Sequence, residues 1–267
     1  MLSLSTIGKG QVQAHTPADA TDSQSSTAPP NAPPDPDPSW HIDLNSYLWF
    51  PGTHGLIGAN GIDVGYKASA TDLLSNFKFG LMGAVGAQRG RVLIFSDMVW
   101  VRLGANKQLV TPIPGVPVLT AQPKLGEFIL TPEFGYRFLD GERIKIDAVG
   151  GLRYWHLESS VQFSPSRFGL NYSQTANWAD PLMGARIQLP VGSRVLFTVL
   201  GDAGGWGAGS ELDWQLLGAV GLRLTPKWML DGGYRYLYTD YRPGNARNFV
   251  LQTAMSGALL GVTYTLK

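Results

Sequence analysis

Apolar and polar residues alternate along most of this chain from residue 40 onward. In the segment 120–138, Phe134 and Tyr136 occupy one parity, whereas Glu133 and Arg137 occupy the other. Successive side chains of a β-strand point to opposite faces, so residues two apart share a face. The pattern therefore predicts strands that carry charge on one face and apolar or aromatic side chains on the other.

Ten segments are predicted as strands: Trp40–Phe50, 78–89, 91–103, 120–138, 143–162, 170–189, 194–206, 210–224, 227–242 and 248–266. Short connections rich in Gly, Pro and Asp, at 89–91, 139–142, 190–193 and 225–227, alternate with generally longer ones, around 104–119, 163–170 and 243–247. Short turns at one end and longer loops at the other are typical of outer-membrane barrels. We therefore predict an all-β fold, an antiparallel up-and-down transmembrane β-barrel of about 10 strands, with 8 or 12 strands as alternatives.

The segment 52–77 does not fit this alternation of turns. Gly61–Ser69 has the pattern of a short strand, and Ala70–Phe77 that of one or two helical turns, with Ser69 or Thr71 as a possible cap. If both segments crossed the membrane, the order of short and long connections downstream would break. We expect 52–77 to be an excursion of the first loop, over or into the barrel mouth.

The apolar face of the strands is expected to contact lipid. Ten strands carry far more large apolar residues than the interior of a barrel of that size holds. Aromatic residues such as Trp40, Phe138, Trp206 and Trp228 gather near strand ends, where the membrane interface favours amphipathic rings. A closed barrel also leaves no unpaired strand edge in hydrocarbon. The polar face is then expected to line the lumen.

Composition agrees with a membrane location. Only 15% of the 267 residues are charged, against about a quarter in soluble domains. The formal net charge of +1 gives no reason to expect a nucleic-acid partner. The chain has no cysteine, which excludes disulfides, thiolate metal sites and thiol catalysis. No apolar run of 18 residues is present.

The first 39 residues differ in composition from the rest. Residues 16–39 are rich in Pro, Ser, Thr, Ala and Asp and predict a disordered tether. Residues 1–14 fit either the tail of a truncated signal peptide, ending in the small-residue sequence Val12-Gln13-Ala14, or further disordered chain. The predicted organisation is 1–39 as signal remnant and tether, and 40–267 as the barrel.

An acid–Gly–Arg repeat marks the polar face, as in Asp147-Gly151-Arg153, and its even spacings place the charges in the lumen. The predicted lumen charge network consists of Asp97, Glu133, Arg137, Asp147, Arg153, Asp180, Arg186, Asp202, Asp213, Arg223, Asp231 and Arg235. With Lys145 and Arg194 on the same face, inward acids and bases number seven each, and an unpaired buried charge is expensive. We therefore expect a mutually paired interior in a structural or surface-interaction barrel. The alternative is a narrow channel for small solutes or hydrophobic ligands.

No enzyme site is predicted. None of the four histidines lies on the lumen face beside a serine, as nucleophilic catalysis requires. His54 with Asp63 or Asp72 is the one conceivable acid–base pair, and a solvated loop residue is the better interpretation of His54. The sequence contains no metal-ligand cluster, phosphate-binding loop or nucleotide motif, so neither metal nor cofactor is expected.

Several motifs resemble a family of uncharacterised bacterial outer-membrane β-barrel proteins, grouped with small barrels of the outer-membrane-protein-A or W kind. These motifs are D-x-x-G-G-x-R-Y-W (147–155), W-x-D-P-x-x-G-x-R (178–186), G-D-x-G-G (201–205), L-x-W-Q (212–215), G-Y-R-Y (233–236) and S-G-x-L-L-G (256–261). The resemblance covers about residues 40–266. It implies the barrel fold, the bacterial cell outer membrane as location, and outer-membrane lipid and the barrel-assembly machinery as partners. It implies no activity and no ligand.

Overall fold

The structure, a computed structural model, describes residues 39–59, 62–104, 107–109, 119–164, 171–243 and 249–266. Of the predicted signal remnant and tether, residues 1–39, only Ser39 lies among the described residues. Among the described residues, no helix is long and apolar enough to cross a membrane.

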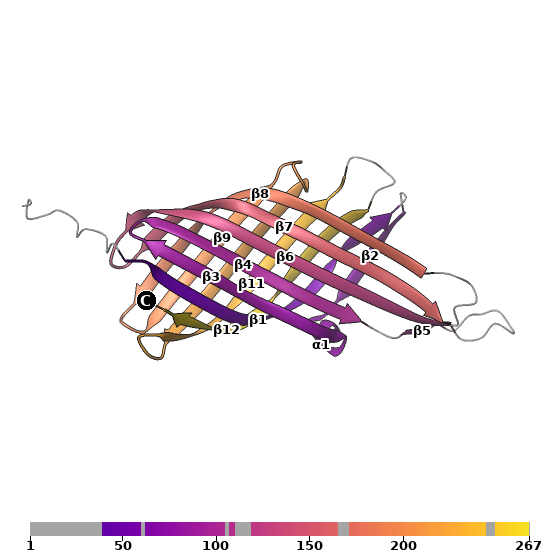
Figure 1. Ribbon diagram of the computed structural model, residues 1–267, viewed down its shortest axis with the longest axis horizontal. Helices are drawn as coiled ribbons and strands as arrows, with labels where there is room; N and C mark the ends of the chain where they lie inside the picture. The colour runs from indigo at the N-terminus through magenta and orange to yellow at the C-terminus, as the bar shows by residue number, and fades with distance from the viewer. Residues whose placement is uncertain are drawn as a thin grey trace, which may run out of the picture. The chain divides into compact units, whose positions relative to one another are not determined.

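Ten antiparallel strands form a closed barrel, which confirms the predicted fold (Figure 1). In order around the wall they are β1 (His41–Ala59), β3 (Phe77–Arg89), β4 (Val92–Gly104), β6 (Leu119–Asp140), β7 (Lys145–Ser164), β8 (Asn171–Val191), β9 (Val195–Gly205), β10 (Leu212–Arg223), β11 (Trp228–Tyr241) and β12 (Val250–Thr265). β12 pairs with β1 from Asp43↔Thr265 to Gly58↔Val250 and closes the ring. The nine strands after β1 begin and end within about two residues of their predicted bounds, as alternation and turn chemistry allow.

The first strand is longer than predicted. β1 continues past Phe50 to Ala59, and its last part forms a hairpin with β2 (Ile62–Ala68). Sequence alone missed this extension because Pro51, Gly52 and Gly55 are poor strand formers. A second added hairpin joins β5 (Lys107–Leu109) to β6.

The short helix predicted between the first two barrel strands is present as α1 (Ala70–Ser75). Ser69 caps it, because the Ser69 side chain accepts a hydrogen bond from the backbone N–H of Asp72 at 3.2 Å. The Asp72 carboxylate in turn accepts from the backbone N–H of Ser69 at 2.9 Å. This reciprocal arrangement is a capping box and fixes where the helix begins.

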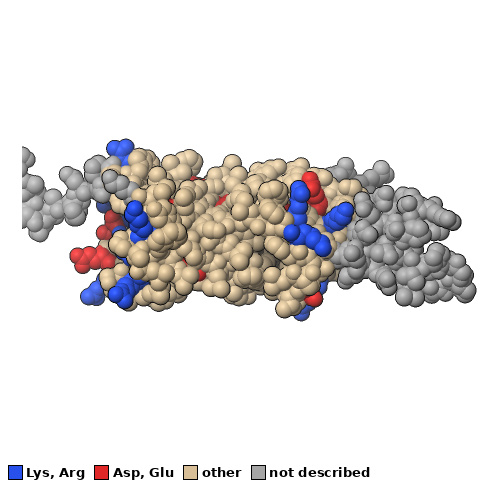
Figure 2. All heavy atoms as spheres, turned by 60° about the horizontal axis from the view of Figure 1, so that its bottom comes forward, with Lys and Arg blue, Asp and Glu red and all other residues tan. Residues whose placement is uncertain are grey.

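The outer face of the wall is apolar. Leu48, Leu152 and Leu216 are 54%, 50% and 51% exposed, whereas the neighbouring Arg153 and Gln215 are buried inside the barrel. Figure 2 shows a broad band with few charged side chains between two rims where Lys, Arg, Asp and Glu gather. An outward apolar band between polar rims is the surface that a bilayer covers.

Two lumen-facing glycines allow neighbouring strands to approach closely. A Cβ atom on Gly151 would lie 2.1 Å from the carbonyl oxygen of Pro132, and one on Gly184 would lie 2.1 Å from that of Gly201. No side chain fits at either position. Both glycines lie between the acid and the arginine of the repeat, where the neighbouring backbone leaves no room for a side chain.

The two ends of the barrel differ. The short connections, such as those around Gly90 and Gly192, lie at the end where β1 begins and β12 ends. We call the half of the lumen nearer to these connections the short-turn half and the other the long-loop half. β6, β7 and β8 have 22, 20 and 21 residues, whereas β9, β10 and β11 have 11, 12 and 14. The wall therefore extends further on the β6–β8 side (Figure 1).

Candidate functional site

Asp147 binds two arginines in the short-turn half of the lumen. The Nε–H of Arg137 donates to Oδ1 of Asp147 at 2.8 Å, and the Nε–H of Arg186 donates to Oδ2 at 2.8 Å. In the strand register Asp147 lies directly opposite both arginines, on β6 and on β8. These are the contacts between adjacent strands that parity predicts. Arg137 also donates to the Gln188 side chain at 3.1 Å.

Arg153 forms the centre of the network at mid-barrel. Its guanidinium donates to Asp213, and it donates to Asp202 at 2.9 Å and to the Thr131 hydroxyl at 3.3 Å. Arg153, Asp213 and Thr131 are fully buried, and Asp202 is 6% exposed. Arg153 lies opposite Asp180 in the register, yet it reaches past β8 to β9 and β10. Contacts between adjacent strands alone would not have predicted this ion pair.

Arg235 spans the lumen from β11 to β4. Its Nη1 donates to Oδ1 of Asp97 at 2.9 Å and to the Tyr47 hydroxyl at 3.3 Å. The guanidinium carbon lies 5.0 Å from the ring centroid of Trp49, a cation–π geometry. Among the residues that the structure describes, the Nε and Nη2 atoms of Arg235 have no hydrogen-bond partner.

Two further acids of the predicted network are held by hydrogen bonds instead of ion pairs. Asp180 accepts from the Trp178 indole at 3.0 Å and from the backbone N–H of Ser210 at 2.6 Å. Asp231 accepts from the Thr263 hydroxyl at 2.6 Å. Both acids are therefore satisfied without an arginine.

The last two predicted residues have contrasting positions. Glu133 is 2% exposed, and its Oε1 atom has no hydrogen-bond partner in the described part of the chain. Arg223 lies apart from the buried network, because β10 ends at this residue and the side chain is exposed at the short-turn end. Parity assigned both side chains to the lumen face but could not say how deep along the strand each one lies.

The same face becomes apolar in the long-loop half. On β4, β6 and β7 the charged residues of the network are followed, toward the long loops, by Val99, Ile129 and Leu157. Trp155 and Trp178 stack in the lumen with ring centroids 5.4 Å apart. The sequence analysis described the lumen by its charges, and these apolar residues are what it left out.

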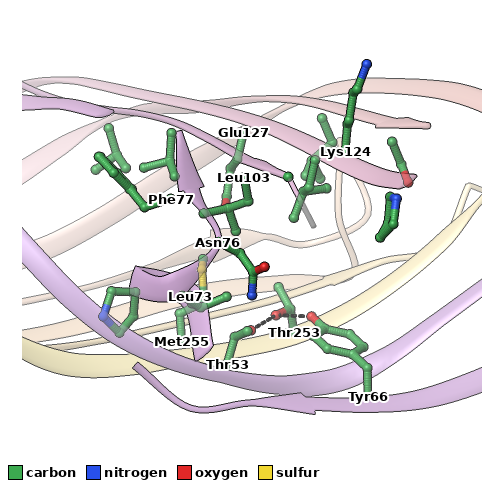
Figure 3. A pocket seen from close by; sticks show the side chains of 18 of the residues that line it. Thr53, Tyr66, Leu73, Asn76, Phe77, Leu103, Lys124, Glu127, Thr253 and Met255 are labelled. Carbon is green, nitrogen blue, oxygen red and sulfur yellow. Dashed lines mark hydrogen bonds between the residues drawn. The ribbon is translucent and has the colours of Figure 1, made fainter. Parts of the chain in front are cut away.

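An apolar cavity of about 490 Å³ occupies this half of the barrel. Its inner wall includes Val99, Leu125, Leu157, Ala176, Leu251 and Met255. The cavity also reaches Leu48 and Phe50 of β1 and Leu74 of α1. Leu73 of α1 and Phe77 of β3 line it as well (Figure 3). Leu48, on the outward parity of β1, is exposed on the outer surface, and Leu74 is exposed as well. The cavity thus runs from the lumen into the wall.

The wall has an interrupted strand ladder at this place. β1 pairs with β3 only from His41↔Gln88 to Ser46↔Gly83, and it pairs with β2 only from Thr53 onward. Among the described residues, 47–52 of β1 have no register partner on that side. There the backbone N–H of Trp49 donates to the Met82 sulfur at 3.2 Å. α1 lies beside this interruption, as shown by the contact between Gly52 and the backbone of Ser69 and Ala70 at the start of the helix.

Few polar groups face the cavity. On one wall the Tyr66 hydroxyl donates to the Thr253 hydroxyl at 2.5 Å, and the Oγ1 atoms of Thr253 and Thr53 are 3.1 Å apart (Figure 3). Glu127 of β6 contributes a carboxylate. Sequence reasoning missed Glu127, although it shares the parity of Glu133. The sequence could have indicated it, because Glu127 is a carboxylate between two apolar residues, Leu125 and Ile129, on the same strand face.

The predicted acid–base candidate is not assembled by the register of β1 and β2. His54 lies opposite Lys67, and Asp63 lies opposite Gly58. The Asp72 carboxylate is engaged in the cap of α1. In the part of the chain that the structure describes, no group of three or more His, Cys, Asp or Glu side chains is arranged to hold a metal ion.

No known sequence family and no curated protein sequence matches this chain. Among solved structures it is similar to the Escherichia coli outer membrane protease OmpT, with a TM-score of 0.51 and 10% identity over 86% of this chain and 98% of that one. The translocator domain of the Neisseria meningitidis autotransporter NalP gives 0.42 at 14% identity, covering 84% and 88%, and Yersinia pestis Ail gives 0.36 at 11%, covering 85% and 98%. At such identity the likeness concerns the fold alone. The chain has the fold of a bacterial outer-membrane β-barrel.

Proposed function

We propose that this barrel binds a hydrophobic ligand in the cavity of its long-loop half and receives it sideways from the membrane. The observation that carries the proposal is an apolar cavity that continues through an interrupted strand ladder to lipid-facing side chains. This is the hydrophobic-ligand form of the alternative that the sequence left open.

The size and lining of the cavity support this function. A volume of about 490 Å³ falls within the range of about 300–1,000 Å³ that is usual for small-molecule sites. Water finds few hydrogen-bond partners in a space lined by Val99, Leu157 and Met255. An apolar ligand removes that apolar surface from water, which is favourable.

The position of the opening supports a route through the wall. In outer-membrane barrels the short turns face the periplasm, so the cavity belongs to the half nearer the cell exterior. The opening is flanked by Leu48, Phe79 and Leu81, which are exposed on the lipid face. Toward the periplasm the lumen is filled by Arg153, Asp202 and their partners. The apolar lining of the cavity therefore continues toward lipid, whereas the charged network closes the periplasmic side.

Methionine methyl groups provide a direct test by NMR of the full chain in lipid nanodiscs. Met82 and Met255 line the cavity, whereas Met183 is 62% exposed on the lipid face. Titration with decane should shift the Met82 and Met255 signals to saturation. Met183 reports simple partition of decane into the bilayer and should not show the same saturating curve.

A matched pair of substitutions on β8 controls this test. Ala176→Phe fills the cavity, since Ala176 is buried in its wall, and should abolish the saturating shifts. Ala179→Phe adds the same bulk on the exposed outer face of the strand and should leave them unchanged. Equal decane binding by both variants would contradict the proposal.

A second candidate function is a rigid scaffold that presents its loops at the cell surface. It is favoured by the buried ion pairs of Arg153 and Arg235, which close the lumen. The two candidates differ in the decane experiment, because a scaffold without a ligand site shows no saturable shift of Met82 or Met255.

A further inference from the structure

Glu127 is the one acidic residue among the described residues that line the apolar cavity. Glu127 faces the lumen from β6, and its register partners on the neighbouring strands are Val101 and Leu157. Leu125 and Ile129 flank it on its own strand face. No hydrogen bond or ion pair joins the Glu127 side chain to any residue that the structure describes.

In the described chain the Arg235 guanidinium acts on Glu127 electrostatically, but no nearby polar group forms a hydrogen bond or an ion pair with it. The hydroxyls of Thr53, Tyr66 and Thr253 bond to one another on another part of the wall. Lys124 lies on the same strand, but its side chain is exposed and points away from the cavity in Figure 3. Within the described chain the Glu127 oxygens therefore face the cavity contents.

This arrangement selects against a purely apolar ligand. A hydrocarbon that filled the cavity would remove water from Glu127 and replace it with nothing, which leaves a buried polar group unsatisfied. A ligand that places a hydrogen-bond donor at this carboxylate avoids that cost and gains a charge-assisted bond. Specificity of this kind arises as much from the penalty on the wrong ligand as from the contact with the right one.

We infer that the ligand of this cavity is an amphiphile whose apolar body fills the space among Val99, Leu157 and Met255 and whose hydrogen-bond-donating head, a hydroxyl or a primary ammonium, binds Glu127. This inference rests on the proposed function and adds the chemical class of the ligand. Glu127 is the residue that determines specificity.

The test compares probes that share one apolar body. Decanol, decylamine and decyl methyl ether are titrated into the full chain in nanodiscs, with the Met82 and Met255 methyl signals as the readout and Met183 as the bilayer control. Wild type should bind decanol or decylamine roughly tenfold or more tightly than the ether, as one hydrogen bond to a charged group allows. If decylamine binds more tightly than decanol, the ligand head is an ammonium. If decanol binds as tightly as decylamine, a hydroxyl is sufficient.

Variants at two carboxylates locate the source of the preference. Glu127→Leu should bring all three affinities to within about twofold of one another, mainly by strengthening ether binding. Glu127→Gln should retain the preference for decanol and lose the preference for decylamine, because the amide accepts a hydrogen bond but carries no charge. Glu158→Leu, which removes an exposed carboxylate of β7, should change nothing.

The outcomes separate this inference from the proposed function. If wild type binds all three probes equally, or if Glu127→Leu keeps the discrimination, the inference is overturned while the cavity stays a ligand site. If none of the probes, the ether included, gives a saturable shift of Met82 and Met255, the proposed function itself fails.

Discussion

Arg153 and Arg223 show how differently one residue type behaves on the same predicted face. Arg153 is fully buried and binds two carboxylates, on β9 and β10. Arg223 is exposed at the end of β10. Sequence parity assigned both to the lumen and could not distinguish them, because parity fixes the face of a strand but neither depth nor partner.

Removing Arg153 should therefore destabilise the barrel strongly. Arg153→Ala leaves Asp202 and Asp213 unpaired in the lumen, at a cost of roughly 3–5 kcal/mol in the free energy of unfolding. Arg223→Ala serves as the matched control and should stay within about 0.5 kcal/mol of wild type. Urea unfolding of the two variants in lipid vesicles measures the difference. Similar stabilities for both would show that water fills the lumen around Arg153.

At the scale of elements, strand positions were predictable and the interruption between β1 and β3 was not. Alternation, glycines and turn residues located nine strands closely, because a lipid-facing strand must keep its period over its whole length. The interruption depends on how far β1 runs past Pro51 and where α1 packs. Those are tertiary facts that no local pattern contains.

Tethering α1 to β1 should slow ligand access to the cavity. A Cβ atom on Gly52 would lie 3.8 Å from the backbone nitrogen of Ala70. The two backbone segments are therefore in contact there, and the tether to test is a disulfide between Gly52→Cys and Ala70→Cys. The natural chain has no cysteine to compete. The oxidised variant should reach saturation with decane several-fold more slowly than the same protein after reduction.

The reduced protein is the control, since it carries the same substitutions and keeps the Ser69 cap. A non-reducing gel shift after cleavage between the two cysteines verifies the crosslink. Identical binding rates in the oxidised and reduced forms would place the access route elsewhere, for example through the long-loop end.

For the whole molecule, the network in the short-turn half predicts a barrel that conducts poorly. Arg153, Asp213, Trp155 and Thr131 are fully buried, so they leave no space for hydrated ions among them. In a planar bilayer the wild type should show little steady conductance, and Arg153→Gly combined with Asp213→Gly should raise it. A large wild-type conductance proportional to salt would contradict a closed lumen.

Sequence and structure agree best on the general architecture and least on the site. Because the lipid-facing side of each strand must be apolar, the fold is visible in the two-residue alternation of apolar and polar residues. The cavity is formed by residues such as Val99, Leu157 and Met255, which belong to different strands and look in sequence like ordinary strand residues. Their convergence depends on strand tilt and register.

β1 is paired to very different extents with its two neighbours in the barrel, and this difference determines where the wall opens most easily. β1 shares sixteen register pairs with β12, where the chain ends meet, and only six with β3, its next barrel neighbour. Local opening of a protein begins where the fewest backbone hydrogen bonds must break. The seam between β1 and β3, beside the cavity, is therefore held by far fewer backbone pairs than the seam between β1 and β12. In the described wall we therefore expect local opening to begin at the β1–β3 seam, where it exposes the apolar cavity to lipid.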